Sequence, residues 1–346
     1  MKFNYKIKQI NEDFIVDEVS LKPDFYNSNK SSFSYLWIKK RGMTTFEALE
    51  ILRKEFELQQ KSISHQGLKD EDGVTSQLIS IRKIIFQRDL DKFNLKYKIG
   101  DFQIQIENIL GYGKKELAPR LLHGNKFKLV IRNLNKKEAE SFYKFCQNNR
   151  LISFINYYDK QRFGIVGGPY NTHLIGKGIA KQDWVKAYKE FKKSKNNDLF
   201  SLLPPKKIDS NNCKKFFKQL NFNQVHFFIS SYNSYLWNKK VNNYINKINK
   251  NNFQYFFSGI GLMSFIKKEN SFIQNIIAVK GCEINKGNYK VSRKEYIRNL
   301  QVTTTVFPIN IDKDELNKGK YRARVSFFLP TGSYATMLIK QIFIKL

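Results

Sequence analysis

A short polar segment, residues 67–77 (GLKDEDGVTSQ), contains residue types that could do acid–base or nucleophilic chemistry. It places a glycine, the cation Lys69 and the carboxylate Asp70 between a helix-like segment and a strand-like one. Such a turn can hold one acidic side chain outside the core with a positive charge beside it. The acid then stays ionised and can serve as a nucleophile or a base. Lys-Asp pairs are also common on inert surfaces, so the segment gains weight only from motifs elsewhere in the chain.

The chain carries a large excess of positive charge, with 61 Lys and Arg against 30 Asp and Glu and a formal net charge of +31. A surplus of this size favours polyanionic partners, because each neutralised phosphate releases counterions. An A/T-rich genome would also enrich lysine and asparagine, and a lysine-rich surface is often only a solvated one. We predict a nucleic-acid partner, and RNA rather than DNA, because the sequence has no basic zipper, zinc finger or obvious helix-turn-helix.

Size and composition limit which classes of protein this chain can belong to. A chain of 346 residues with 41% hydrophobic residues can bury a substantial core in one large domain or two ordinary ones. The three cysteines and four histidines are widely spaced, which suits a reducing cytoplasm and predicts neither a disulfide framework nor a metal site. The apolar runs are too short to span a bilayer, and the N-terminus lacks the features of a secretory signal. We therefore expect a cytoplasmic protein with no membrane partner and no metal.

The first half of the chain alternates strand and helix signals. Period-two alternation predicts strands at residues 14–18, 103–107 and 127–132. Thr44 and Glu47 form a capping-box pattern, which predicts that a helix starts there. The apolar residues that follow at helical spacing are Phe46, Leu49, Leu52 and Phe56. A second helix is predicted to start near Asn135.

From about residue 182 to about residue 308 the sequence becomes rich in lysine and asparagine. One strong helix pattern lies in this region, and its apolar stripe is formed by Val225, Phe228, Ile229, Tyr232 and Leu236. Strand-like alternation returns at residues 323–329, and a helix over residues 335–343 follows it. We predict an α+β protein in which a sheet-containing part is interrupted by a more helical insertion.

Five motifs occur in order along the chain: KQINEDFIVDE (8–18), GLKDEDGVTSQ (67–77), GNKF (124–127), NYYDKQRFG (156–164) and LPTGSYAT (329–336). Together they closely resemble the motifs of the TruD family of tRNA pseudouridine synthases. That family shows EDFxVxE, GxKDxxAxTxQ, GNxF, NYFGxQRFG and LPxGS followed by F or Y and AT, in the same order. The segment SYLWN (234–238) is similar to the SxLFN helix of that family, so the resemblance spans nearly the whole chain.

The resemblance implies a fold and an activity. It implies an α+β protein whose catalytic domain, residues 1–181 and 309–346, has a mixed or antiparallel sheet. An inserted α/β (TRUD) domain would span residues 182–308, with an RNA cleft between the two. The implied activity converts uridine to pseudouridine at position thirteen of tRNA. The N1–C1′ bond breaks, the uracil turns and C5 joins C1′, with no cofactor and no metal. We also expect the protein to be a monomer.

The resemblance also assigns site residues. Asp70 is implied as the catalytic nucleophile, and the residues implied to line the pocket for a flipped base are Phe14, Asn156 and Tyr334. Tyr158 stands where the family usually has Phe, and we expect it to stack on the uracil. Plainer interpretations exist for these residues: a turn-capping acid, a core phenylalanine, a turn asparagine and a tyrosine packed under the last helix.

The cation beside Asp70 has two candidates, which we count among the substrate-binding residues. Lys8 lies in the first motif, and Lys69 directly precedes the acid. In a third possibility both lysines simply face solvent. The chain departs from the family pattern at Asn11 (usually Pro), at Gly73 (usually Ala) and at residues 158–159 (usually Phe-Gly). None of these changes removes a chemical group that the reaction needs.

Two other functions stay open from the sequence. A non-catalytic RNA-binding protein or RNA chaperone could keep this fold, although the intact motifs argue against it. A metal-dependent nuclease could use Asp70 with Asp72, or Glu12 with Asp13. These acidic pairs are close neighbours in sequence rather than spread over convergent strands, which disfavours the nuclease.

Overall fold

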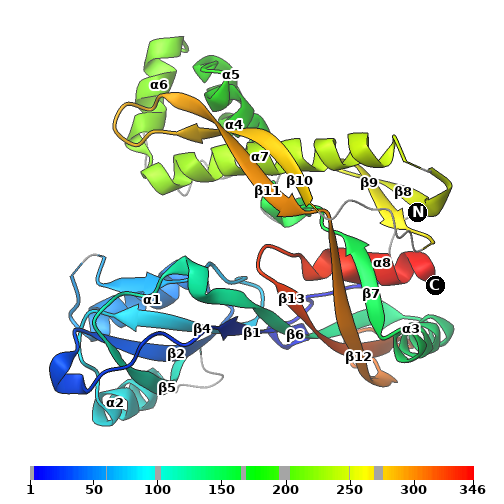
Figure 1. Ribbon diagram of the computed structural model, residues 1–346, viewed down its shortest axis with the longest axis horizontal. Coiled ribbons are helices and arrows are strands. Elements are labelled where there is room, and N and C mark those ends of the chain that lie inside the picture. The colour runs from blue at the N-terminus through cyan, green and yellow to red at the C-terminus, as the bar shows by residue number, and fades with distance from the viewer. Residues whose placement is uncertain are drawn as a thin grey trace. The chain divides into compact units, whose positions relative to one another are not determined.

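The largest sheet of the computed structural model is mixed and contains nine strands within the described part of the chain (Figure 1). The structure describes residues 4–59, 61–97, 103–164, 169–194, 203–248, 250–268 and 276–346. The chain divides into two compact units. We call the one that contains Lys2–Ile152 and Thr304–Gly332 the sheet unit. The one that contains Ser153–Thr303 and Ser333–Lys345 is the helical unit.

The strand order of the large sheet is β5-β2-β4-β1-β6-β13-β12-β7, with β3 paired to β4. The strands are β1 (Phe14–Ser20), β2 (Phe33–Arg41), β3 (Ile63–His65), β4 (Val74–Ile81), β5 (Ile104–Gly113), β6 (Leu122–Leu134), β7 (Leu151–Ile155), β12 (Gln301–Lys313) and β13 (Tyr321–Pro330). β1 pairs with β4 in parallel, with Ile15 opposite Val74, whereas β1 with β6 and β6 with β13 are antiparallel. Because β1 and β4 are parallel neighbours, the segments that precede them meet at one edge of the sheet.

The predicted strands are present. The alternation at residues 14–18, 103–107, 127–132 and 323–329 corresponds to β1, β5, β6 and β13. In β1 and β13 the buried and less buried residues alternate, as expected for strands with one core face. The expected α+β class with a mixed sheet is confirmed.

The helices of the sheet unit are α1 (Thr45–Glu55), α2 (Gln87–Tyr97) and α3 (Lys136–Asn148). The capping box predicted for α1 forms: the Glu47 N–H donates to the Thr44 hydroxyl at 3.2 Å, and the Thr44 N–H donates to the Glu47 carboxylate at 2.7 Å. Asn135 caps α3 in the same way, through Glu138.

α1 and α2 pack on β2, β4 and β5 (Figure 1). Their buried side chains join those of the strands in one apolar core, with Ala48 and Leu52 from α1 and Leu90 and Phe93 from α2. Phe46 does not belong to this face, although its spacing suggested it. The residue is 59% exposed, because the buried face of α1 is formed by Thr45, Ala48 and Leu52 and Phe46 lies beside that face.

The helical unit contains five α-helices and four further strands within its described residues. They are α4 (Thr172–Ala180), α5 (Trp184–Lys193), α6 (Ser210–Gln219), α7 (Phe222–Ile245), β8 (Phe253–Ser258), β9 (Gly261–Ile266), β10 (Ile276–Ile284), β11 (Val291–Asn299) and α8 (Ala335–Lys345). β8–β9 and β10–β11 are two-stranded antiparallel sheets. Val225, Phe228 and Ile229 of the predicted stripe join the core formed with α4, α5 and α6, whereas Tyr232 and Leu236 are only partly buried.

Single-turn 3-10 helices lie at Asn11–Asp13, Ser28–Lys30, Pro119–Leu121, Lys160–Arg162 and Lys250–Asn252. The boundaries of the compact units fall inside β7 and β12. The catalytic domain of residues 1–181 and 309–346, with an insertion of residues 182–308, stays a prediction. In the part of the chain that the structure describes, every helix is too short or too polar to cross a membrane.

Candidate functional site

Asp70 lies in the loop between β3 and β4, at the edge of the sheet where the segment before β1 also arrives. Its side chain is 31% exposed, so the carboxylate reaches solvent. The ammonium of Lys8 donates to Asp70 Oδ1 at 3.0 Å. A charge-assisted hydrogen bond of this kind stabilises the negative charge and fixes the direction of the carboxylate.

The backbone of the Asp70 loop is held by the end of β2 and the start of α1. The N–H of Lys69 donates to the hydroxyl of Thr45 at 3.0 Å, and the buried ammonium of Lys40 donates to the main-chain carbonyl of Asp70 at 2.7 Å. Gly73 passes so close to β1 that a Cβ there would lie 2.5 Å from the carbonyl oxygen of Phe14. Glycine is therefore required at this departure from the family pattern.

Lys8 and Lys69 have different partners. Lys8 is the one that pairs with Asp70. The ammonium of Lys69 lies 2.5 Å from a carboxylate oxygen of Glu18 and donates to the amide oxygen of Asn125 at 2.9 Å. Both side chains of the Lys69–Glu18 pair are buried, so Lys69 braces the loop against β1 and β6. Thus the structure separates the two lysines that the sequence left equivalent.

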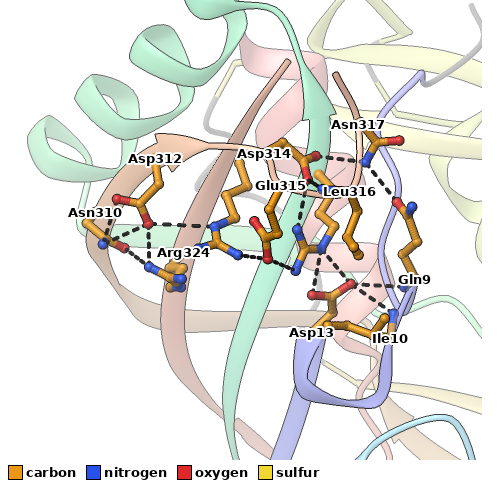
Figure 2. Close-up of polar contacts among 12 residues, drawn as sticks. Gln9, Ile10, Asp13, Asn310, Asp312, Asp314, Glu315, Leu316, Asn317 and Arg324 are labelled. Atoms are coloured by element: carbon orange, nitrogen blue, oxygen red, sulfur yellow. Dashed lines mark hydrogen bonds and ion pairs between the residues drawn. The ribbon is translucent and has the colours of Figure 1, made fainter. Parts of the chain in front are cut away.

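Lys8 has a left-handed backbone conformation, with φ of 59°. The next two N–H groups, of Gln9 and Ile10, both donate to Oδ2 of Asp13, at 3.0 and 3.2 Å (Figure 2). A non-glycine residue in this conformation is uncommon and persists when its surroundings determine it. Here the buried carboxylate of Asp13 supplies that constraint.

Asp13 is itself fixed by Arg132 of β6, which is almost completely buried. The guanidinium donates to both oxygens of Asp13, at 2.7 and 2.9 Å, and to Asp314 and Glu315 from the loop between β12 and β13, at 2.8 and 3.0 Å. Burial opposes the charge of Arg132, but the hydrogen bonds to the three carboxylates raise its pKa. Figure 2 shows how these acids converge. We call these four residues the Arg132 cluster.

Phe14 begins β1 and is buried. Its ring lies edge-on to that of Phe127 with centroids 5.9 Å apart, and the Lys8 ammonium lies 4.1 Å from its centroid. The structure therefore brings Phe14, Lys8 and Asp70 into one contiguous group in the sheet unit. A cation over an aromatic face is favourable, so Phe14 helps to position Lys8.

Asn156, Tyr158 and Tyr334 form a second group, in the helical unit. The rings of Tyr158 and Tyr334 meet edge to face with centroids 5.8 Å apart. Burial raises the pKa of Tyr334 to about 12, so its hydroxyl stays protonated at neutral pH. Asn238 of α7 fixes the backbone of Tyr158, because its amide accepts from the Tyr158 N–H at 3.0 Å and donates to the Tyr158 carbonyl at 2.8 Å.

Arg298 of β11 organises this second group and was not predicted from the sequence. It donates to the amide oxygen of Asn156 at 2.7 Å and to its main-chain carbonyl at 3.0 Å, and its guanidinium lies 3.9 Å from the centroid of the Tyr158 ring. The amide nitrogen of Asn156 donates to the carbonyl of Asn299 at 3.2 Å. Both ends of the Asn156 amide thus have protein partners, which fix its orientation.

Asp159, which stands where the family usually has glycine, is buried and pairs with Lys340 of α8 at 2.6 Å. Burial opposes ionisation, but the charge of Lys340 and its hydrogen bond lower the pKa of Asp159. The departure at this position therefore has a local partner in the chain. It adds an ion pair that ties the segment after Tyr158 to the last helix.

The burial of Lys40 could have been predicted from the sequence. Leu36, Ile38 and Lys40 alternate along β2 and share its buried face. A lysine at the end of such a series is a buried lysine, although the neighbouring Lys39 and Arg41 make it look like part of a solvated basic run. For Arg298 we find no comparable signal, because β11 carries charged residues at several consecutive positions.

A family model described as tRNA pseudouridine synthase D (TruD) matches residues 2–198, more than half of the chain. The chain belongs to the TruD family. The match includes Lys8, Phe14, Asp70, Asn156 and Tyr158 of the two groups. Tyr334 and Arg298 lie outside the matched residues, so their placement comes from the structure and, for Tyr334, from the LPTGSYAT motif.

Relatives of full length agree with this membership of the TruD family. The chain is 28% identical to "Probable tRNA pseudouridine synthase D 1" of Methanococcus maripaludis, over 98% of this chain and 99% of the relative. It is 26% identical to "tRNA pseudouridine synthase D" of Leptospira interrogans, over 99% and 96%. The fold is similar to the crystal structure of a Methanosarcina mazei protein assigned as tRNA pseudouridine synthase D (TruD). The TM-score is 0.60 at 21% identity, over 97% of this chain and 92% of that one.

Proposed function

We propose that this protein isomerises uridine to pseudouridine in tRNA and that Asp70 is its catalytic residue. Membership of the TruD family supports the reaction. The observation that carries the assignment of Asp70 is its geometry: a solvent-reaching carboxylate with one oxygen 3.0 Å from the Lys8 ammonium. The formal charge of +31 supports a polyanionic substrate.

The chemistry needs a carboxylate that can act at the sugar or the base. In the proposed reaction the N1–C1′ bond of the uridine breaks while Asp70 holds the sugar carbon as a nucleophile. The uracil turns, C5 bonds to C1′ and Asp70 is released. The proton lost from C5 is balanced by the proton gained at N1, so the product is an isomer of the substrate. Lys8 stabilises the carboxylate whenever Asp70 is free.

The target base must leave its stack before a side chain can reach the glycosidic bond. We propose that Tyr158 stacks on the extruded uracil, which is worth about 1–3 kcal/mol per base. The amide of Asn156 would recognise the uracil edge, and Tyr334 would support the stacking ring. Phe14 would hold Lys8 in place beside Asp70.

The finer features of the proposal rest on the motif resemblance. The modified uridine is proposed to be position thirteen of tRNA. The catalytic domain is proposed to comprise residues 1–181 and 309–346, with the inserted domain at residues 182–308. We further propose that the enzyme is a cytoplasmic monomer. Mapping pseudouridines in bulk tRNA with and without the protein tests the position directly.

Substitution of Asp70 tests the reaction. Release of tritium from tRNA labelled at uracil C5 reports turnover, and a filter-binding assay reports tRNA affinity. We expect Asp70→Asn to lower turnover by at least about 10³-fold, because it removes the nucleophile, and to change tRNA affinity by less than about threefold. The matched control is Asp72→Asn, an exposed acid in the same loop, which should keep wild-type turnover.

Each result separates two explanations. Full turnover by Asp70→Asn would remove this residue from the mechanism. A wild-type protein that binds tRNA without releasing tritium would be a non-catalytic RNA-binding protein with this fold. Tritium release without a pseudouridine at position thirteen would keep the reaction and refute the target.

A further inference from the structure

Lys40 is a fully buried lysine whose ammonium contacts main-chain oxygen rather than an acid. Its side chain lies in the interior, with 0% of the residue exposed. Within the described chain its two hydrogen bonds go to the carbonyl oxygens of Met43, at 2.6 Å, and of Asp70, at 2.7 Å. The second of these residues is the proposed nucleophile. Lys40 therefore joins the end of β2 directly to the backbone of the Asp70 loop.

Joining two segments through a buried ammonium costs free energy. Removing a charge from water is unfavourable unless the charge is paired and hydrogen-bonded, and a hydrophobic residue of similar volume is often equally stabilising. Leu36 and Ile38 occupy the preceding positions on the same face of β2 and fill the core without any charge. The fold could continue that series at residue 40, so the ammonium has a use beyond packing.

Two lysines contact Asp70, one at its side chain and one at its main chain. Lys8 holds the carboxylate itself, and Lys40 holds the carbonyl of the same residue. We propose that Lys40 is a positioning residue that fixes the backbone of Asp70, so that its carboxylate points at the sugar of the bound uridine. This inference rests on the proposed function of Asp70. In this proposal Lys40 acts through the main chain of Asp70 and not on the substrate itself.

The protonation state of Lys40 gives the proposal a distinctive signature. Burial lowers the pKa of Lys40 to about 8; Asp70, Glu71 and Glu47 oppose this shift, and Lys69 adds to it. The positively charged form is therefore present at neutral pH and is lost as the pH rises through about 8. A neutral amine binds the carbonyl of Asp70 less strongly than an ammonium does. We expect the hold on the loop to weaken at alkaline pH.

Lys40→Met tests the proposal, because methionine keeps an unbranched side chain only one atom shorter and removes the charge and the donors. We expect the single-turnover rate at saturating tRNA and pH 7 to fall at least tenfold, which corresponds to about 1.4 kcal/mol of activation free energy. The affinity for tRNA should change by less than about threefold. The ratio of wild-type to variant rate should fall between pH 7 and pH 9, because only the wild type loses an ammonium there.

The matched control is Lys39→Met, the neighbouring lysine on the other face of β2, which lies 3.5 Å from Glu107. It should keep the wild-type rate at every pH. A ratio of rates that stays constant across this pH range would show that Lys40 acts only through general stability and would overturn the proposal. A wild-type rate for Lys40→Met, or a loss confined to tRNA affinity, would overturn it as well.

A second variant covers the case in which Lys40→Met does not fold. Thr45→Val removes the hydroxyl that accepts from the N–H of Lys69 in the same loop and donates to Gln77, without changing a charge or the size of the side chain. We expect about tenfold slower turnover with unchanged tRNA affinity, and a wild-type rate would overturn the proposal. If the wild-type protein itself shows no turnover, the proposed function fails and this inference fails with it. If the wild type is active and Lys40→Met is equally active, the inference about Lys40 is refuted and the proposed function stands.

Discussion

The Arg132 cluster predicts that removal of one buried cation is far more damaging than removal of an exposed one nearby. Arg132→Met leaves the carboxylates of Asp13 and Asp314, both fully buried, without their guanidinium. Breaking a buried ion pair from one side typically costs about 3–5 kcal/mol of unfolding free energy. Asp13 keeps its hydrogen bonds from two N–H groups. Asp314 keeps those from the N–H groups of Asn133 and Leu316 and from the side-chain amide of Asn317, so we expect the lower end, about 3 kcal/mol.

Urea unfolding followed by circular dichroism measures this cost. For a slope of about 2 kcal/mol per molar urea, a loss of 3 kcal/mol lowers the midpoint by about 1.5 M. The matched control is Arg324→Met, which removes a partly exposed guanidinium that pairs with Asp312 at the edge of the same region (Figure 2). A surface pair of this kind contributes about 0–1 kcal/mol, so this midpoint should move by less than about 0.5 M.

The pH dependence of the stability difference between wild type and Arg132→Met gives a second check. Although burial opposes ionisation, the N–H of Asn133, further hydrogen bonds and Arg132 lower the pKa of Asp314 below its ordinary value of 3.8. A lowered acid pKa contributes stability above the unfolded value and loses it as the pH falls through the folded value. The difference in unfolding free energy between wild type and Arg132→Met should therefore be largest at pH 7 and become smaller below about pH 4. Equal midpoints for the Arg132 and Arg324 variants at pH 7 would refute the reasoning.

Two further predictions concern the helical unit. Arg298→Met should slow single-turnover pseudouridine formation by about 10-fold or more, because Asn156 and Tyr158 lose the guanidinium that orients them. Arg293→Met, on the same strand, is the control. Equal rates for the two variants would contradict this role of Arg298. Burial lowers the pKa of His173 from 6.5 to about 4, so stability is full above pH 6.5 and should fall by about 2–3 kcal/mol by pH 4.5. Urea midpoints of His173→Phe should lack this fall between the two pH values, and an unchanged pH dependence would exclude His173 as its source.

Most of the elements that position Asp70 were predictable from local patterns. Alternation in the sequence identified β1, β5, β6 and β13, and in β1 and β13 the burial alternates along the strand as well. The capping box identified the start of α1, since its hydrogen bonds are local. The prediction that Phe46 belongs to the apolar face of α1 was wrong, because the buried face is centred on Thr45, Ala48 and Leu52 and the spacing of the apolar residues alone did not show this.

The site was harder to predict, because its contacts join residues far apart in the chain. The motifs singled out Asp70 and both candidate lysines, but the choice between Lys8 and Lys69 depends on Glu18, which occupies Lys69 in the interior. Arg298 gave no signal because a charged strand does not show which residue reaches inward. The roles of Phe14, Asn156, Tyr158 and Tyr334 in holding a base stay predictions.

The Arg132 cluster also bears on how the protein is made. Its members come from the beginning, the middle and the end of the polypeptide: Arg132 reaches Asp13 across 119 positions and Asp314 across 182. Contacts between such distant residues form late, since a long loop must close first. During synthesis, Arg132 has only Asp13 as a partner until Asp314 and Glu315, which follow β12, leave the ribosome. We expect nascent or truncated chains to hold Lys8 poorly, so that the catalytic arrangement is acquired only by the finished polypeptide.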